Sequence, residues 1–366
     1  MVCKRVSPYI GLGIMKDRST MNNRIRCAGR YVIAVIVLTG SLARAAPSEV
    51  PLPKLPQGPI EMRVAHVVNS RLPRMNEAQL QVLLAATKKA TREHFGVDLR
   101  FAPVKEIPIE GLFARIPAER RKTALEQIYD FKTGKGDRAR LAKAFGSGFK
   151  ESGDPLADLI AFARPHIGEL KVDSYEALGA AVAEFQLSRI ERWKTIKALD
   201  GGPAIDAPPY NEFPMWIALG FVDLPFELVL TNQPIASVEY VFPAIHSAIR
   251  GGYSNGLTSP SISSRFKTIS VWSTFALTTN DEWVNQLREG ETYTAEEAAQ
   301  LAGTTAAHEI GHQLFHFLHP FGQSACLMNP VSMFAYRAWA KKLSPKDCPI
   351  GSSPAMRPGA YTFLVD

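Results

Sequence analysis

The stretch TAEEAAQLAGTTAAHEIGHQLFHFLHP, residues 294–320, decides how this chain is organised, because it combines a long helical pattern with a cluster of histidines. It begins with a Thr-x-x-Glu capping box, in which two side chains satisfy free backbone N–H groups of the first helical turn. Helix-forming and apolar residues continue to Phe317, and Pro320 blocks further helix. We therefore predict one long helix over 295–317.

His308, Glu309 and His312 form an HExxH pattern within this predicted helix. Histidines four residues apart lie on one face of a helix, so both imidazoles can reach one ion at the roughly 2.0–2.1 Å of a zinc–nitrogen bond. Zinc acidifies a bound water and polarises a carbonyl, and Glu309 lies beside it to take the proton. The pattern predicts a Zn²⁺ site with His308 and His312 as ligands and Glu309 as the general base.

The third ligand is less clearly marked than the first two, and a catalytic zinc usually has three protein ligands and one open position. The downstream candidates are His316, His319, Asp347 and Asp366, since no glutamate follows Glu309. In a straight helix His316 would lie about 12 Å from His308, too far to share the ion. We favour His319, which precedes Pro320 where the chain must turn, with His316 or a more remote residue as alternatives.

The positive charge of the chain is concentrated at its start. The formal net charge is +7, yet eight of the 42 Lys and Arg residues and one of the 35 Asp and Glu residues lie in 1–45. Both counts are therefore 34 in the remainder, which is formally neutral. Because a nucleic-acid-binding protein carries a basic footprint, we expect no nucleic-acid partner.

Residues 1–45 have the pattern of an export signal. Three arginines between positions 24 and 30 precede an apolar run over 31–38, and an A-x-A cleavage pattern ends at Ala45. The apolar run is shorter than the roughly 20 residues of a bilayer span. We predict a cleaved signal peptide, with Met21 as an alternative start, no stable membrane span after cleavage, and a periplasmic or secreted mature protein.

Removal of residues 1–45 would leave two of the four cysteines, Cys326 and Cys348. An exported protein matures in an oxidising compartment, where paired cysteines persist as disulfides. We therefore predict a Cys326–Cys348 disulfide.

The rest of the chain predicts a mixed α/β fold. Five prolines over 46–59 indicate an extended linker. A strand pattern over 61–68 and another over 97–102 flank a helical pattern that runs from 78 to 94, between Asn76 as its cap and Gly96 as its stop. Two strands joined by a helix are typical of a parallel pair.

Residues 110–200 carry helical patterns and little strand signal, and we interpret them as a helical insertion. Strand patterns return over 226–231 and 268–275. The stretch 250–260 is rich in Gly, Ser and Asn and is predicted to be a loop.

Taken together, the HExxH pattern, a histidine seven residues after His312 and a following Cys-x-Met sequence resemble the metzincin metallopeptidases, and among them the archaemetzincin-like proteins. The resemblance in motifs covers residues 295–350. It implies a zincin-like catalytic domain over 60–366: a twisted mixed sheet, an active-site helix, the helical insertion, and a small C-terminal subdomain after a Met-turn. It assigns Glu309 as the catalytic base, and it gives the metal ligands and the Met-turn residue as His308, His312, His319 and Met328.

The sequence departs from the family pattern after the second histidine. The family has a glycine three residues on, where Phe315 stands, and its third ligand six residues on, one position before His319. Archaeal-type members also carry four cysteines at a second metal site, of which only Cys326 and Cys348 have counterparts here. The resemblance therefore favours a disulfide over a second zinc.

These observations predict a zinc-dependent hydrolase, and specifically a metallo-endopeptidase. Glu309 would assist attack of zinc-bound water on a peptide or protein substrate that lies extended along an edge strand. The irregular spacing of the third ligand motivates a second hypothesis, a catalytically inactive zinc-binding envelope protein that acts as a binding or scaffold module.

Overall fold

A computed structural model describes residues 57–126, 138–169, 171–205, 209–236, 245–317, 319–320, 322–331 and 333–348. The predicted signal peptide and most of the linker over 46–59 lie outside the described residues. All described residues belong to one compact unit.

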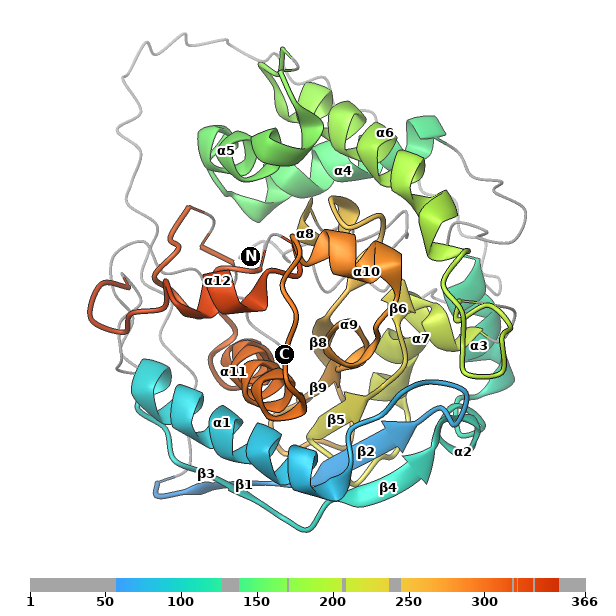
Figure 1. Ribbon diagram of the computed structural model, residues 1–366, viewed down its shortest axis with the longest axis vertical. Coiled ribbons are helices and arrows are strands. Elements are labelled where there is room, and N and C mark those ends of the chain that lie inside the picture. The colour runs from blue at the N-terminus through green and yellow to red at the C-terminus, as the bar shows by residue number, and fades with distance from the viewer. Residues whose placement is uncertain are drawn as a thin grey trace, which may run out of the picture. The chain divides into compact units, whose positions relative to one another are not determined.

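A five-stranded mixed sheet forms the framework of the fold (Figure 1). Its strands, in spatial order, are β4 (Lys105–Pro108), β2 (Val64–Val68), β5 (Leu228–Thr231), β9 (Thr268–Ser273) and β8 (Gly256–Pro260). The pairs from β4 to β9 are parallel, whereas β8 lies at the edge and is antiparallel to β9. Every residue of β2, β5 and β9 is buried, as expected for parallel strands covered on both faces.

Two smaller sheets, twelve α-helices and two short 3₁₀ helices, Pro209–Asn211 and Leu219–Phe221, complete the described part of the chain. The small sheets are the parallel pair β1 (Ile60–Met62) with β3 (Leu99–Phe101) and the antiparallel pair β6 (Ile235–Ala236) with β7 (Tyr253–Ser254). The helices are α1 (Glu77–Phe95), α2 (Ile109–Phe113), α3 (Ala118–Leu125), α4 (Arg138–Ser152), α5 (Leu156–Ile167), α6 (Tyr175–Trp193), α7 (Phe213–Ala218), α8 (Ile245–Ala248), α9 (Phe275–Thr278), α10 (Glu282–Leu287), α11 (Ala295–Phe315) and α12 (Tyr336–Ala340).

Helix α1 forms where the local signals place it. Asn76 caps it in a capping box with Gln79, and Gly96 ends it in the left-handed conformation with φ 70°. The helix connects β1 to β3, which pair in parallel, so the predicted β-α-β start is confirmed. The predicted strand over 61–68 is instead divided between two sheets, as β1 and β2.

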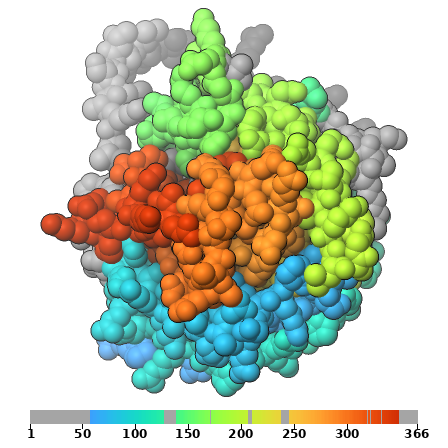
Figure 2. Space-filling view, in the orientation of Figure 1, coloured from blue at the N-terminus to red at the C-terminus, as the bar shows by residue number. Residues whose placement is uncertain are grey.

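Helices α1 and α11 pack closely on each other, and Gly303 lies at their contact. A Cβ atom at Gly303 would overlap the carbonyl oxygen of Leu83 and lie 2.7 Å from the Ala86 Cβ. In the space-filling view, early (blue to cyan) and late (orange) parts of the chain lie side by side on one face (Figure 2). The glycine that weakens the helical pattern of α11 is therefore required by its packing.

The predicted mixed α/β class is confirmed, and one local prediction is wrong. Residues 250–260 are not simply a loop, because they contain β7 and the edge strand β8. Alternate residues of β8 are buried, and Pro260 is tolerated at its end because an edge strand needs fewer backbone donors. The glycine, serine and asparagine residues of this stretch favour loops, so its sequence did not predict the strand.

The region 110–200 is helical in its described parts, as predicted. Helix α4 packs on α6, and α6 also contacts α8, which lies close before the edge strand in the chain. Helices α2 and α3 belong to another cluster: Leu112, Phe113 and Ala124 join a core with residues of β2, β5 and β9. The helical region therefore joins the sheet through α2 and α3 and contacts α8 through α6.

Candidate metal centre

Helix α11 and the turn after it bring three histidines together. The Nε2 atoms of His308 and His312 are 3.0 Å apart, and each lies 3.1 Å from Nε2 of His319. Three nitrogens bound to one tetrahedral zinc at 2.0–2.1 Å would be separated by roughly 3.3 Å. The three imidazoles therefore have the arrangement of three ligands on one side of a single ion.

Backbone carbonyls fix which nitrogen of the first two histidines faces the centre. Nδ1 of His308 lies 2.9 Å from the Leu327 carbonyl oxygen, and Nδ1 of His312 lies 2.5 Å from that of Phe317. A carbonyl only accepts, so each Nδ1 carries the proton and donates it. In the neutral ring Nε2 then presents a lone pair, as metal-ligating histidines do.

Burial keeps these rings neutral. It lowers the pKa of His308 to about 4 and that of His312 to about 3, and it lowers the pKa of His319 well below its ordinary value. The neutral rings of His308 and His312, whose Nδ1 atoms already donate, have no hydrogen to share between their own Nε2 atoms. A cation is what such a convergent set of lone pairs fits, so the three residues suit a metal ion such as Zn²⁺.

The end of α11 accounts for the position of His319. The helix ends at Phe315, and His316 follows in the left-handed conformation, with φ 56° and its N–H donating to the His312 carbonyl at 3.0 Å. The turn therefore lies one residue later than the glycine of the family pattern. From His316 to His319 is three residues, the separation between that glycine and the third family ligand. Relative to the metzincin pattern that the sequence resembles, the turn and His319 therefore both lie one residue later.

His316 itself does not join the three-histidine cluster. The left-handed conformation is uncommon for residues other than glycine, although histidine adopts it more often than most. His316 therefore ends helix α11. The geometry favours His319 over His316 as the third ligand.

Met328 packs directly on the helix between the first two histidines. A Cβ atom on Gly311 would overlap its sulfur and lie 2.8 Å from the Phe95 ring. Met328 is 1% exposed and follows Leu327, whose carbonyl orients His308. The turn after α11 therefore supplies both an apolar floor and a hydrogen-bond acceptor to the histidine cluster.

Glu309 lies on the side of α11 that faces the edge strand. Its Oε2 accepts a hydrogen bond from the Thr258 hydroxyl of β8 at 2.9 Å. Burial raises the pKa of Glu309 to about 8, against the opposing effect of that hydrogen bond. A bound cation would act in the same direction as Thr258 and favour the carboxylate.

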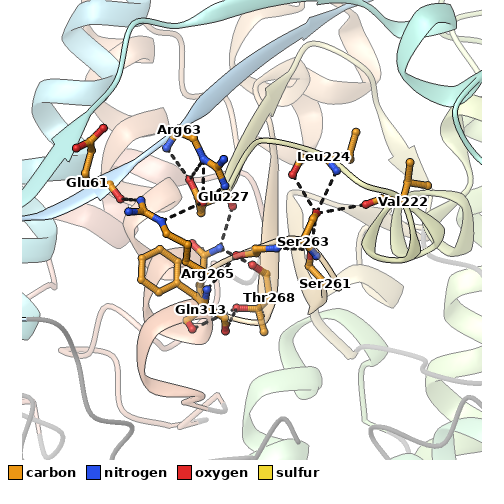
Figure 3. A network of polar contacts seen from close by, with 12 residues as sticks. Glu61, Arg63, Val222, Leu224, Glu227, Ser261, Ser263, Arg265, Thr268 and Gln313 are labelled. Atoms are coloured by element: carbon orange, nitrogen blue, oxygen red, sulfur yellow. Dashed lines mark hydrogen bonds and ion pairs between the residues drawn. The ribbon is translucent and has the colours of Figure 1, made fainter.

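Buried polar contacts fasten α11 to the sheet (Figure 3). The Gln313 side-chain amide donates to the backbone carbonyls of Glu227 at 2.8 Å and Thr268 at 3.0 Å, beside the starts of β5 and β9. The Glu227 carboxylate is buried and accepts from the backbone N–H of Arg63 at 2.7 Å. Gln313 follows His312 directly, so these contacts hold the turn of α11 that carries His312 against the sheet.

A cavity opens beside His308 and Glu309. Its walls come from β8, β9, α11 and the segments around them, and its lining residues are His246, Arg250, Asn255, Gly256, Trp272, Thr305, His308, Glu309, Pro330, Val331 and Trp339. The base and one of the three histidines therefore share a space with the edge strand.

The predicted disulfide is present: Cys326 is bonded to Cys348. It links the turn that carries Met328 to the chain after α12. The disulfide thus fastens the turn beneath the histidine cluster, which carries Leu327 and Met328, to the last described residues.

The sequence predicted the three histidines that converge in the structure, and it did not predict the groups that position them. Thr258 and Gln313 are ordinary polar residues that reach the site only after folding. The acceptors at Leu327 and Phe317 are backbone carbonyls, which no residue type marks. No protein-family model, curated protein or solved structure matches this chain.

Proposed function

We propose that this chain is a zinc-dependent metallopeptidase with a zincin-like fold, and that it cleaves peptide bonds within proteins or peptides. One observation carries the proposal: three neutral histidine Nε2 atoms converge within 3.0–3.1 Å, and a buried glutamate of the same helix lies in an adjoining cavity. This combination suits metal-assisted hydrolysis better than a purely structural site, which would have four protein ligands.

His308, His312 and His319 would hold the ion, which when bound supplies Lewis acidity for a carbonyl and acidifies water. Glu309 would accept a proton from the attacking water and return it to the leaving amine. Thr258 holds the carboxylate at 2.9 Å and so keeps it on the side of β8. The walls of the cavity limit the water that surrounds this proton transfer.

Strand β8 offers a place for an extended substrate. Within the part of the chain that the structure describes, β9 is its one partner strand, and β8 is the last strand of the sheet. A peptide that added to its other side would gain backbone hydrogen bonds without a sequence requirement. Thr258 joins this strand directly to Glu309, so a peptide on β8 would lie next to the base.

Metal content of the purified chain 46–366 tests the site. We expect one zinc per chain, lost in His308→Ala and His319→Ala and kept in His316→Gly, the matched control at the helix end. Zinc retained in His319→Ala would move the third ligand elsewhere. No zinc after reconstitution would end the metallopeptidase proposal.

Glu309→Gln tests the chemistry separately from the metal. We expect full zinc content and a loss of peptide cleavage of roughly 10²-fold or more, because general acid–base catalysis contributes about that much. Cleavage is measured with a peptide library, and Thr258→Val should show a smaller loss. If Glu309→Gln matched the unchanged chain in every assay, the inactive zinc-binding scaffold would be the better proposal.

We also propose that the chain works outside the cytoplasm, as a periplasmic or secreted protein. The Cys326–Cys348 disulfide supports this, because structural disulfides persist in oxidising compartments. Among the described residues, none of the helices has the length and apolar character needed to cross a membrane. N-terminal sequencing of the exported protein checks the predicted cleavage after Ala45.

A further inference from the structure

Arg250 is a buried cation in the wall of the cavity beside Glu309. The residue is 1% exposed, and one of its terminal nitrogens, Nη2, donates to the Val331 carbonyl. Its guanidinium also lies over the Phe334 ring, 5.2 Å from the centroid. The remaining nitrogens, Nε and Nη1, are buried without a hydrogen-bond partner in the described part of the chain.

A second buried arginine shows how this fold treats a structural guanidinium. Arg288 is 3% exposed, and each of its three nitrogens donates: Nε to the Ala276 carbonyl at 2.8 Å, Nη1 to Asn285 at 2.8 Å and Nη2 to the Thr279 carbonyl at 2.7 Å. Arg250 has one such bond. Because a guanidinium stays charged and an unpaired buried charge is strongly unfavourable, Arg250 is short of an anionic partner.

The walls around Arg250 offer further donors. Trp272 lines the same cavity, and its indole Nε1–H is likewise buried without a partner in the described part of the chain. Nδ1 of His246 is also buried without a partner, and in a neutral ring this atom donates or accepts according to the tautomer. Glu309 is the one carboxylate among the lining residues, and it is held by Thr258 rather than by Arg250. The unsatisfied groups of Arg250 and Trp272 are therefore N–H donors, which suits a planar anion with two acceptor oxygens.

We propose that Arg250 binds a carboxylate of the peptide substrate in this cavity, so that the enzyme selects substrates by a negative charge near the scissile bond. The carboxylate would be either the C-terminal group of the peptide or an Asp or Glu side chain. This inference rests on the proposed peptidase function, because the anion site lies beside the base of that reaction. Arg250 is a specificity residue in this scheme and takes no part in proton transfer.

The test is peptide binding to the zinc-loaded Glu309→Gln chain, which is expected to bind without turnover. Two matched pairs separate the sources of the carboxylate: a peptide with a C-terminal acid against its amide, and a peptide with an internal Glu against Gln. We expect one pair to differ in Kd by roughly 10- to 100-fold, the effect of a charge-assisted hydrogen bond. Arg250→Gln should reduce that ratio to near one.

Arg288→Gln is the matched control, since it removes an equally buried guanidinium outside the cavity and should leave the ratio unchanged. If Arg250→Gln fails to fold, Arg250→Lys replaces it in the test. This variant keeps the charge and should retain part of the preference for the charged peptide. A ratio near one in both pairs with Arg250 present, or one unaffected by Arg250→Gln, overturns the proposal. If the chain binds charged peptides selectively but the native chain cleaves none, the carboxylate site is supported and the peptidase proposal is contradicted. If the native chain cleaves peptides without a preference for charge, the peptidase proposal is supported and the carboxylate site is contradicted.

Discussion

At the scale of single residues, the position of the left-handed turn explains the site better than the spacing of histidines does. His316 adopts φ 56° and ψ 31°, and His319, the third histidine of the cluster, follows three residues later. A side chain at such a position is strained relative to glycine by roughly 1 kcal/mol. His316 therefore has a conformational role at the end of the helix, although its residue type suggests a metal ligand.

His316→Gly should keep zinc and raise the free energy of unfolding by up to about 1 kcal/mol, because glycine adopts the left-handed region without strain. His316→Val should lower it by about 1–2 kcal/mol and weaken zinc binding, since a β-branched residue disfavours that turn. Urea unfolding with zinc content measured in parallel checks both. Equal stability of the two variants would contradict the role assigned to the turn.

At the scale of elements, the approach of α1 to α11 decides how the metal-binding helix sits on the sheet. Gly303 leaves no room for a side chain against Leu83. Gly303→Ala should therefore lower the free energy of unfolding by about 1–3 kcal/mol through overpacking, despite the gain in helix propensity. Gly111→Ala is the control: Gly111 is an exposed glycine in α2 with no atom near its Cβ position, and the same change there should be neutral or stabilising. Thermal unfolding of the two variants makes the comparison.

The connection between α4 and α5 contains a buried carboxyl group that should give the helical region a pH dependence. Burial raises the pKa of Asp154 to about 6, so the folded chain binds this proton more tightly than the unfolded chain does. Its contribution to stability is complete below about pH 4 and is lost as the pH rises through 6.

Asp154→Asn should remove that loss. We expect the variant to be more stable than the native chain by roughly 1–3 kcal/mol at pH 7 and close to it at pH 4. Urea unfolding at both values measures the difference, in which the other titrating groups cancel. A difference that does not change with pH would show that the carboxyl group is already paired in the folded state.

At the scale of the whole molecule, zinc should couple the site to global stability. An ion that binds only the folded chain adds about 2.7 kcal/mol at a concentration 100 times its Kd. A chelator should therefore lower the Tm of the native chain and of His316→Gly, and leave that of His319→Ala unchanged. Differential scanning calorimetry with and without chelator provides the measurement, and a chelator-independent Tm for the native chain would argue against a bound metal.

The sequence predicted best those features that depend on nearby residues. The cap at Asn76, the stop at Gly96 and the pairing of His308 with His312 on one helical face are local, and all three appear in the structure. Strand β8 was missed because its residues favour loops and it is stabilised by pairing with a distant strand. Arg250 was missed because its lack of partners exists only in the folded chain.

The end of α11 has a consequence for how its length can vary. Each residue inserted into a helix rotates the chain beyond it by about 100° and advances that chain by 1.5 Å, which would normally misdirect a later side chain. Here the left-handed residue His316 fixes His319 relative to the end of the helix, so the length of α11 sets the direction in which the third imidazole points. Deleting Phe315 should therefore turn His319 away from His308 and His312 and abolish zinc binding, which the metal content of the variant checks.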